Sequence, residues 1–550
     1  MVIRGGFQLL TDKSCKNGTK RVKEADMAHM RNTSMTTLTT SFTLLSLLLL
    51  LVFAALFADV ARAQEEGEIS LPYAAENRQI RRDKFDLIVP KIMRDRGIDM
   101  WIHIMREPIT DPFGEDLGSK SGVIIFTDRG GDRIERAIVG RRWQTSVYEV
   151  KRSEYVDPIP ALGAYDIIGE PVLVIEPLSN PKTEYDFRFN GLREFVDARN
   201  PKRIAVNYRE HLVPWATFAK TDDGISHVDF RLLTKELGET YAGKLVSSEY
   251  LIMDYNVSPV PSEIQLLKKM RADALADVDK TFSSIEPGVT KTGDVAVSVI
   301  RPVQDEQYGW DDAVVQGGDI LAAPTEGRFA YVLREGETEP PAGVQKLWAQ
   351  KLMIDKILKE FIRPGLTGRE IMKSYEQKLA DAGIVVIDPR LTRPQTNLFE
   401  SLCFLKPTLG VWQLDFGWEA CWDEGSNIYP GDFDPDHTQI VFDMHGVGKG
   451  AREAKFDHGL GPRMGSYGPD WMREIPLADN HHFALEYFFY MPSPTDEGEY
   501  LVFWNHEQMI ATESGIEHLS PPQKELLLIR YPTAAQDDDS SYFDWLFKKG

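Results

Sequence analysis

The residues best suited to chemistry gather in the C-terminal part of this chain. Imidazole is the commonest metal ligand and a proton carrier near neutral pH. A histidine followed by two spaced glutamates suits a hard or borderline divalent metal, and this stretch also holds Glu486 and Glu507. Seven of the eleven histidines lie here: His437, His445, His458, His481, His482, His506 and His518. The pattern indicates metal or acid–base chemistry, although ordinary surface histidines would cluster in the same way.

Runs of apolar residues predict the strands that must position these side chains. We expect strands over residues 319–323, 331–334, 440–443 and 484–490. A repeated pattern accompanies them, because a helix ending at Phe282 precedes Glu286-Pro287-Gly288-Val289-Thr290, and a helix ending at Phe361 precedes Arg363-Pro364-Gly365-Leu366-Thr367. We interpret this second part of the chain as two related halves.

The first part of the chain predicts a mixed α/β domain that ends near Tyr255. A helix is expected over residues 76–96, with Pro90 kinking or splitting it and Gly97 capping it. Strands are expected over residues 100–105, 123–127, 134–139, 172–175 and 203–207. Ser258-Pro259-Val260-Pro261 is the predicted domain boundary, and Ser262 with Gln265 fits a capping box for the next helix.

Length and composition predict an exported protein of two folded domains. The chain has 550 residues, too many for one ordinary core. Residues 44–58 are apolar except for Ser46 and are followed by Ala61-Arg62-Ala63, which is typical of a cleaved signal peptide; a retained anchor is the alternative. The signal sits unusually far from Met1. We therefore expect the true start at Met27, Met30 or Met35, with residues 1–26 a mis-called extension.

The net charge limits the classes of binding partner, and the cysteine content limits the number of disulfides. Cleavage after residue 63 would remove eight basic and four acidic residues and change the formal net charge from −21 to −25. Such a chain repels phosphate backbones, which argues against nucleic acid and anionic membranes as partners. Only Cys403 and Cys421 would remain. One disulfide is permitted in an oxidising compartment, but the chain is not built on disulfides.

These features together resemble the creatinase/prolidase/Xaa-Pro aminopeptidase family. A small α/β domain precedes duplicated helix–Pro-Gly-x-Thr units, and His458, Glu486 and Glu507 follow in that order. The best-matching pieces are Gly318-Asp319-Ile320-Leu321, the stretch from Ala330 to Glu337, Pro364-Gly365-Leu366-Thr367-Gly368, and the stretch from His445 to Glu507.

The resemblance implies an α/β fold in four segments. They are a signal segment over residues 1–63, a creatinase-like N-terminal domain over 76–257, a pita-bread domain with an internal pseudo-repeat over 262–530, and an acidic, aromatic tail over 531–550.

The resemblance also implies a ligand set, which this sequence holds only in part. The family binds two divalent metals with two aspartates, one histidine and two glutamates, and His458, Glu486 and Glu507 match the last three. The segment after Gly318-Asp319 contains no aspartate where the family has its pair, so we expect at most one tightly bound ion (Mn, Zn or Co), or none. Asp415 in Asp415-Phe416-Gly417 is a candidate replacement. His445 is assigned as proton shuttle or substrate contact, with a structural histidine as the alternative.

Three functions are consistent with these residues. The first is an exported, periplasmic or secreted Xaa-Pro aminopeptidase- or dipeptidase-like metallohydrolase of short peptides, weak or inactive. The second is a catalytically dead relative that binds peptides or a protein, and the third is a metal-free C–N hydrolase like creatinase, using His445. A homodimer is expected by resemblance, and no stable membrane span is expected after signal cleavage.

Overall fold

The structure is a computed structural model. It describes residues 73–105, 114–119, 121–143, 159–173, 187–211, 224–295, 297–300, 313–323, 327–386, 437–447, 462, 464, 470–494 and 500–531. Several predictions lie outside these residues: the export segment, His458, Asp415 and its neighbours, the cysteine pair Cys403 and Cys421, and the C-terminal tail.

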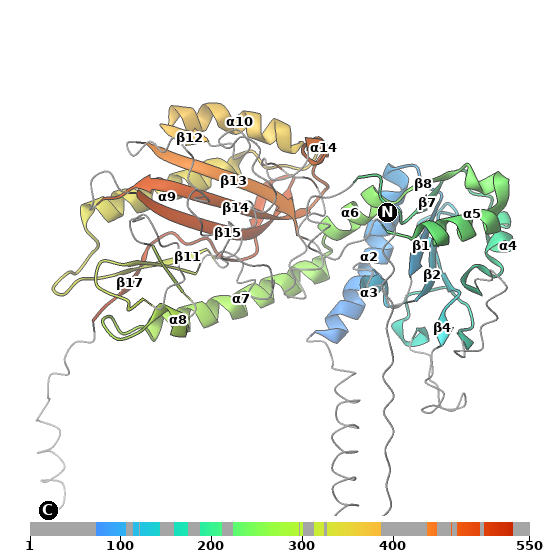
Figure 1. Ribbon diagram of the computed structural model, residues 1–550, viewed down its shortest axis with the longest axis horizontal. Coiled ribbons are helices and arrows are strands. Elements are labelled where there is room, and N and C mark those ends of the chain that lie inside the picture. Colours follow the sequence, from blue (N-terminus) through green and yellow to red (C-terminus); the bar gives the residue numbers. More distant parts are fainter. Residues whose placement is uncertain are drawn as a thin grey trace, which may run out of the picture. The chain divides into compact units, whose positions relative to one another are not determined.

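The first part of the chain forms a six-stranded mixed sheet in the order β5-β3-β2-β1-β7-β8. β1 pairs antiparallel with β2 and parallel with β7. Figure 1 labels these strands within one sheet. The strands are β1 (Met100–Met105), β2 (Gly122–Thr127), β3 (Glu135–Val139), β5 (Ile167–Ile168), β7 (Ile204–Val206) and β8 (Leu245–Ser247), beside a separate pair, β4 (Arg142–Trp143) and β6 (Val172–Leu173). The predicted strand at residues 100–105 and the predicted hairpin are confirmed.

Helices cover both faces of this sheet because its central strands are apolar on both sides. One core joins Trp101 and Phe126 to Phe85 of α2. The other joins Ile102 and Ile125 to helices α4 and α5. The helical elements are α2 (Ala74–Asp95), α3 (Gly114–Leu117), η2 (Pro160–Leu162), η3 (Phe187–Phe189), α4 (Leu192–Asp197), α5 (His227–Ala242) and α6 (Glu249–Val257).

The helix predicted over residues 76–96 is α2, which runs from Ala74 to Asp95 through Pro90 without being split and is followed by Gly97 at φ 61°. One expectation about helix boundaries in this region was wrong. Ser262 does not cap α7 (Pro261–Ser283), since Pro261 occupies the first turn and no side chain caps the N-terminus. Instead, the Ser262 hydroxyl donates to Asp83 Oδ2 at 2.5 Å. The Ser262 hydroxyl thus bonds to a side chain distant in the sequence and not to the backbone at the start of its own helix.

The second part of the chain contains two further sheets (Figure 1). The four-stranded sheet has the order β17-β11-β10-β9 and the five-stranded sheet the order β12-β13-β14-β15-β16. The strands of the first are β9 (Ser298–Ile300), β10 (Ile320–Ala323), β11 (Arg328–Val332) and β17 (Leu527–Ile529). Those of the second are β12 (Ile384–Val386), β13 (Thr438–Gly446), β14 (His481–Pro492), β15 (Tyr500–Thr512) and β16 (Gly515–His518). β11 begins and ends earlier than the predicted strand at residues 331–334.

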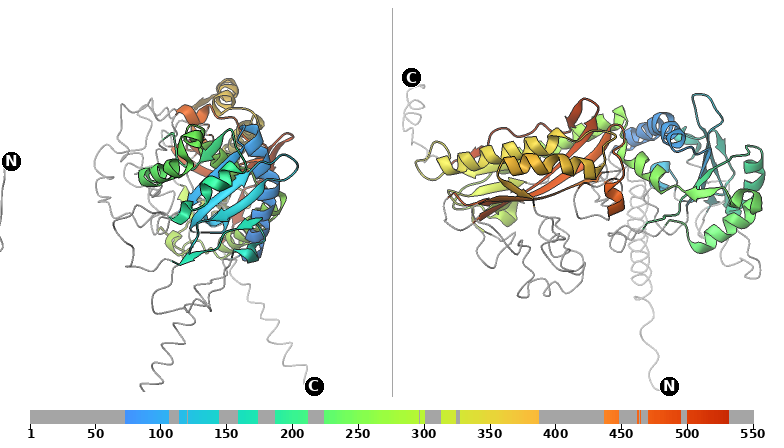
Figure 2. Two further views of the ribbon diagram at one scale, coloured as in Figure 1. Left: turned by 90° about the vertical axis from the view of Figure 1, so that its right-hand side faces the viewer. Right: turned by 90° about the horizontal axis from the view of Figure 1, so that it is seen from above.

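The long helices α9 (Ala342–Glu360) and α10 (Gly368–Asp381) run along one face of the five-stranded sheet, as the right-hand view of Figure 2 shows. Ile354 and Tyr375 of these helices share a core with Phe442, Leu485 and Phe503 of the strands. Residues two apart in a strand face the same side, so this core fixes which strand residues face the helices. The shorter helices are α8 (Thr292–Val295) and α14 (Asp470–Arg473).

The two Pro-Gly turns adopt similar backbone geometries. Gly288 and Gly365 have φ values of 84° and 81°. Gly288 N donates to Val315 O at 2.7 Å, and Gly365 N donates to Leu477 O at 2.8 Å. The return bonds, both 2.9 Å, differ by one position: Val315 N donates to Thr290 O, two residues after Gly288, whereas Leu477 N donates to Leu366 O, one residue after Gly365. The repeated sequence pattern therefore corresponds to two similar turns that differ in one hydrogen bond.

The predicted mixed α/β fold is confirmed by these sheets and their covering helices. No helix among the described residues has the length and apolar character needed to cross a membrane.

Candidate metal centre

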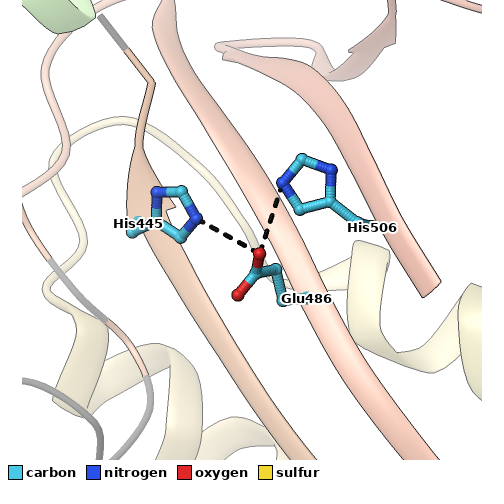
Figure 3. A group of neighbouring side chains, drawn as sticks. All are labelled: His445, Glu486 and His506. Atoms are coloured by element: carbon cyan, nitrogen blue, oxygen red, sulfur yellow. Dashed lines mark ion pairs between the residues drawn. The ribbon is translucent and has the colours of Figure 1, made fainter. Parts of the chain in front are cut away.

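Three neighbouring strands bring His445, Glu486 and His506 together on one face of the five-stranded sheet. Glu486 of β14 lies directly opposite His506 of β15, and His445 of β13 lies opposite Ala484, two residues from Glu486. His506 Nε2 is 3.3 Å and His445 Nε2 is 3.7 Å from the same carboxylate oxygen, Glu486 Oε1. Figure 3 shows both rings pointing at this oxygen.

The side chains of the cluster are shielded from solvent. His445 is 4% and His506 6% exposed, while the Glu486 side chain is 20% exposed. His445 Nδ1 lies 3.1 Å from Gly446 O. A carbonyl oxygen can only accept, so this contact requires a proton on Nδ1, and Nε2 is the ring nitrogen that faces Glu486. His445 is thus oriented as a metal ligand would be.

Burial also keeps His506 in the neutral form that binds metal. Loss of solvent is the main cause that lowers its pKa, to about 4; Glu486 opposes this effect and His445 reinforces it. A neutral imidazole with an available nitrogen is the state required of a ligand.

The donor set and its spacing fit a single divalent ion. Bonds of about 2.0–2.1 Å in a tetrahedron place neighbouring ligand atoms about 3.4 Å apart, close to the 3.3 and 3.7 Å between the histidine nitrogens and Glu486 Oε1. One ligand atom from each residue lies within 4.8 Å of the others. Two imidazoles with one glutamate form a three-ligand set known from catalytic zinc sites, in which a fourth position stays open.

The predicted site residues have different outcomes. Glu486 lies in the cluster. His445, expected to shuttle protons or contact substrate, lies there as well and can serve as a ligand. His458 lies outside the described residues and stays a prediction. Glu507 is not part of this group, because successive residues of a strand face opposite sides and His506 precedes it.

Glu507 instead belongs to a buried polar network under α9. Lys359 Nζ lies 2.7 Å from Glu507 Oε2, and Asn505 Nδ2 donates to Glu507 Oε1 at 2.8 Å. Burial alone would raise the pKa of Glu507, but Lys359 and Lys351 outweigh it and hold the pKa at about 2. The carboxylate is therefore charged and already neutralised by a lysine.

The same network continues along α9. Lys351 Nζ is 2.6 Å from Asp355 Oδ2, and Tyr487 donates to Asp355 while accepting from Asn505. Tyr487 alternates with Glu486, and Asn505 with His506. These strands consequently carry a candidate metal centre on one face and a buried polar network on the other.

The sequence reasoning missed His506. His506 lies opposite Glu486 on the neighbouring strand, and this pairing can be recognised only when the register of β14 and β15 is known.

Comparisons with known proteins give only remote similarities. No protein-family model matches the chain and no curated protein is similar to it. Among solved structures, an X-Pro aminopeptidase from Thermotoga maritima has a TM-score of 0.43 at 14% identity, covering 80% of this chain and 100% of that one. A putative aminopeptidase P from Bacillus anthracis gives 0.44 at 12%, covering 80% and 95%. The prolidase from Pyrococcus horikoshii gives 0.38 at 16%, covering 80% and 99%. Similarity of this degree does not establish membership of a family.

Proposed function

We propose that this chain is a hydrolase of short peptides that uses one divalent metal ion held by His445, Glu486 and His506. The observation that carries this proposal is the convergence of two buried imidazoles and one carboxylate at ligand spacing. The order of sequence motifs, which resembles the Xaa-Pro peptidases, supports a peptide as the substrate.

The chemistry of the residues is consistent with hydrolysis. A divalent ion supplies Lewis-acid activation of a carbonyl group and of water when it is bound at such a site. His445 is oriented by the contact of its Nδ1 with Gly446 O, and burial keeps His506 in its neutral form. The cluster formed by the described side chains holds a single carboxylate, which supports one ion rather than two, because a second cation would lack charge compensation.

Export belongs to the same proposal, on the evidence of the apolar run and Ala61-Arg62-Ala63. Mass spectrometry of the exported protein should find an N-terminus at or near Gln64. A full-length cytoplasmic product beginning at Met1 would contradict it.

Metal analysis combined with a peptide screen tests the catalytic proposal. Purified protein should bind one equivalent of Zn²⁺, Mn²⁺ or Co²⁺ tightly, and hydrolysis of Xaa-Pro dipeptides and tripeptides should depend on that ion. Two tightly bound ions, or none, would contradict the proposed centre. Tight binding of one ion with no hydrolysis of any peptide would favour the peptide-binding relative instead.

A further inference from the structure

The buried polar network under α9 begins one residue away from the candidate ligands on both strands. Glu486 and His506 lie directly opposite each other, and the adjacent pair along β14 and β15 is Tyr487 and Asn505. Successive residues of a strand face opposite sides of the sheet. The second pair therefore shares its backbone with the ligand pair but points away from the candidate metal centre.

Five side chains of this network form a closed ring of contacts between α9, β14 and β15. Tyr487 of β14 donates to Asp355 of α9 and accepts from Asn505 of β15. Asn505 Nδ2 also donates to Glu507 Oε1 at 2.8 Å, and Lys359 Nζ of α9 lies 2.7 Å from Glu507 Oε2. Asp355 and Lys359 are four residues apart and so lie on one face of the helix. These five side chains, termed the α9 ring below, join each of the three elements to the other two.

The α9 ring lies within a core that is apolar on either side of it. Asn505 is 0% and Asp355 8% exposed, while Leu485, Phe503 and Met509, on the same face of the strands, belong to the hydrophobic core. Replacement of a buried ionic network by well-packed apolar residues is often neutral or stabilising, so stability alone does not account for polar residues here. A connected network adds direction, because hydrogen bonds fix orientation and apolar burial does not.

A glycine encloses the α9 ring from another side. Gly327 has a φ of 61°, and a Cβ added to it would lie 3.1 Å from Glu507 Cγ and 3.3 Å from Asn505 Oδ1. Contacts this close leave the two side chains little room to shift. The strand segment that carries His506 between Asn505 and Glu507 is therefore held from both sides.

We propose that the α9 ring holds Glu486 and His506 at ligand spacing, so that its members are positioning residues for the metal centre. This inference rests on the proposed function. Glu486 Oε1 and His506 Nε2 lie 3.3 Å apart, and such a site works only when its supporting residues hold the ligand atoms to within about 0.5 Å. Because consecutive Cα atoms are linked at a fixed distance of about 3.8 Å, a shift of Tyr487 or Asn505 moves the ligand beside it.

Titration with Co²⁺, followed by visible absorption, tests this role because the absorption of bound Co²⁺ reports its coordination geometry. Tyr487→Phe removes only the hydroxyl group that links Asp355 to Asn505, and Lys359→Met removes the ammonium group at Glu507. Leu379→Ala is the matched control, since Leu379 of α10 is equally buried and packs in the same core but touches no member of the α9 ring by a polar contact.

We expect both ring variants to shift the Co²⁺ absorption bands and to weaken Co²⁺ binding by about three- to tenfold. This loss is smaller than the 10–100-fold typical of residues that bond to a ligand directly, because the ring acts through the backbone. Leu379→Ala should lower the urea midpoint while the bands and the affinity stay those of the wild type. If Lys359→Met does not fold, Tyr487→Phe alone decides the question.

The wild-type titration separates failure of this inference from failure of the proposed function. Wild-type protein that binds no Co²⁺ would overturn the metal centre and the positioning role together. Wild-type binding with unchanged bands and affinity in Tyr487→Phe would overturn the positioning role alone. An equal change of the bands in Leu379→Ala would also overturn it, since any loss of core packing would then have the same effect.

Discussion

The first Pro-Gly unit comprises the turn at Gly288 and strands β9, β10 and β11, and the second comprises the turn at Gly365 and strands β12 to β16. The two units have similar turns but different side chains on their strands. Both place a left-handed glycine after a long helix and exchange two backbone hydrogen bonds with a distant segment. In the first unit, Leu321 and Ala330 face one apolar core, and Ile320 and Phe329 face another. In the second unit, strands β13, β14 and β15 present the candidate ligands on one face.

The backbone geometry of the turn can therefore stay the same while the side chains of the following strands change. Backbone hydrogen bonds of the turns depend little on side chains outside the Pro-Gly pair, so the same turn can precede apolar or polar strands. In the described part of the first unit, strands β10 and β11 contain no carboxylate, histidine or cysteine. Among the described residues, the one candidate metal cluster therefore lies in the second unit.

The largest expected effect follows the removal of one candidate metal ligand from the second unit. His506→Ala should lower Zn²⁺ affinity more than about a hundredfold, because even partners of ligands are worth 10–100-fold. Isothermal titration calorimetry measures this loss, and His227→Ala, which removes an exposed histidine from the start of α5, is the control. Unchanged affinity in His506→Ala would show that the two units do not differ in the way proposed.

The second unit should also be the more sensitive to breaking its buried network. Lys351→Ala leaves Asp355 buried without its lysine at 2.6 Å and should destabilise the protein by about 3–5 kcal/mol. Urea unfolding measures the change. The exposed pair of Arg369 and Glu474 provides the contrast, since Arg369→Ala should cost less than about 1 kcal/mol. Similar losses for both variants would contradict a structural role for the network.

Acid should weaken the second unit through its buried histidines. Burial lowers the pKa of His481 and of His482 to about 3 and that of His506 to about 4, below the unfolded value of about 6.5. The unfolded chain therefore binds protons first. Stability is complete above about pH 6.5 and falls towards pH 3–4, by up to about 1.4 kcal/mol per pH unit for each histidine.

Unfolding free energies at pH 7, 6 and 5 measure this slope. His481→Leu should make it shallower by about one proton. A slope unaffected by His481→Leu would argue that another group takes up the protons.

The smallest expected effects on stability come from the glycines of the two turns, and the two effects should be equal. A Cβ added at Gly288 or Gly365 meets nothing within 4 Å, so only the positive φ opposes substitution. Gly288→Ala and Gly365→Ala should each cost about 1 kcal/mol, measured by thermal or urea unfolding. A clear difference between the two would break the structural equivalence of the turns.

Local patterns in the sequence predicted the fold better than the site. The apolar run at residues 100–105 is sufficient to predict a buried strand, and the Pro-Gly motif predicts its own turn. The prediction of a capping box at Ser262 was wrong, because Ser262 lies inside α7 and its hydroxyl donates to Asp83, which is distant in the sequence. The capping box that does form, Thr367 with Glu370, was overlooked although its sequence pattern is as clear.

The site depends on pairings that no local pattern contains. Glu507 matches a ligand motif, yet its side of β15 faces Lys359. His506 joins the cluster because β14 and β15 pair with Glu486 opposite it. Choosing between adjacent residues of one strand requires the register and the buried face, and both are set by contacts across the sheet.

The arrangement of the cluster across three paired strands has a consequence for folding. A slip of β15 by one residue would replace His506 with Glu507 beside Glu486 and turn the lysine-bound carboxylate away from α9. Two carboxylates would then face each other, and Lys359 would lose its partner. The slipped register is therefore disfavoured by loss of the buried Lys359–Glu507 ion pair, and this pair helps to select the native alignment of β15.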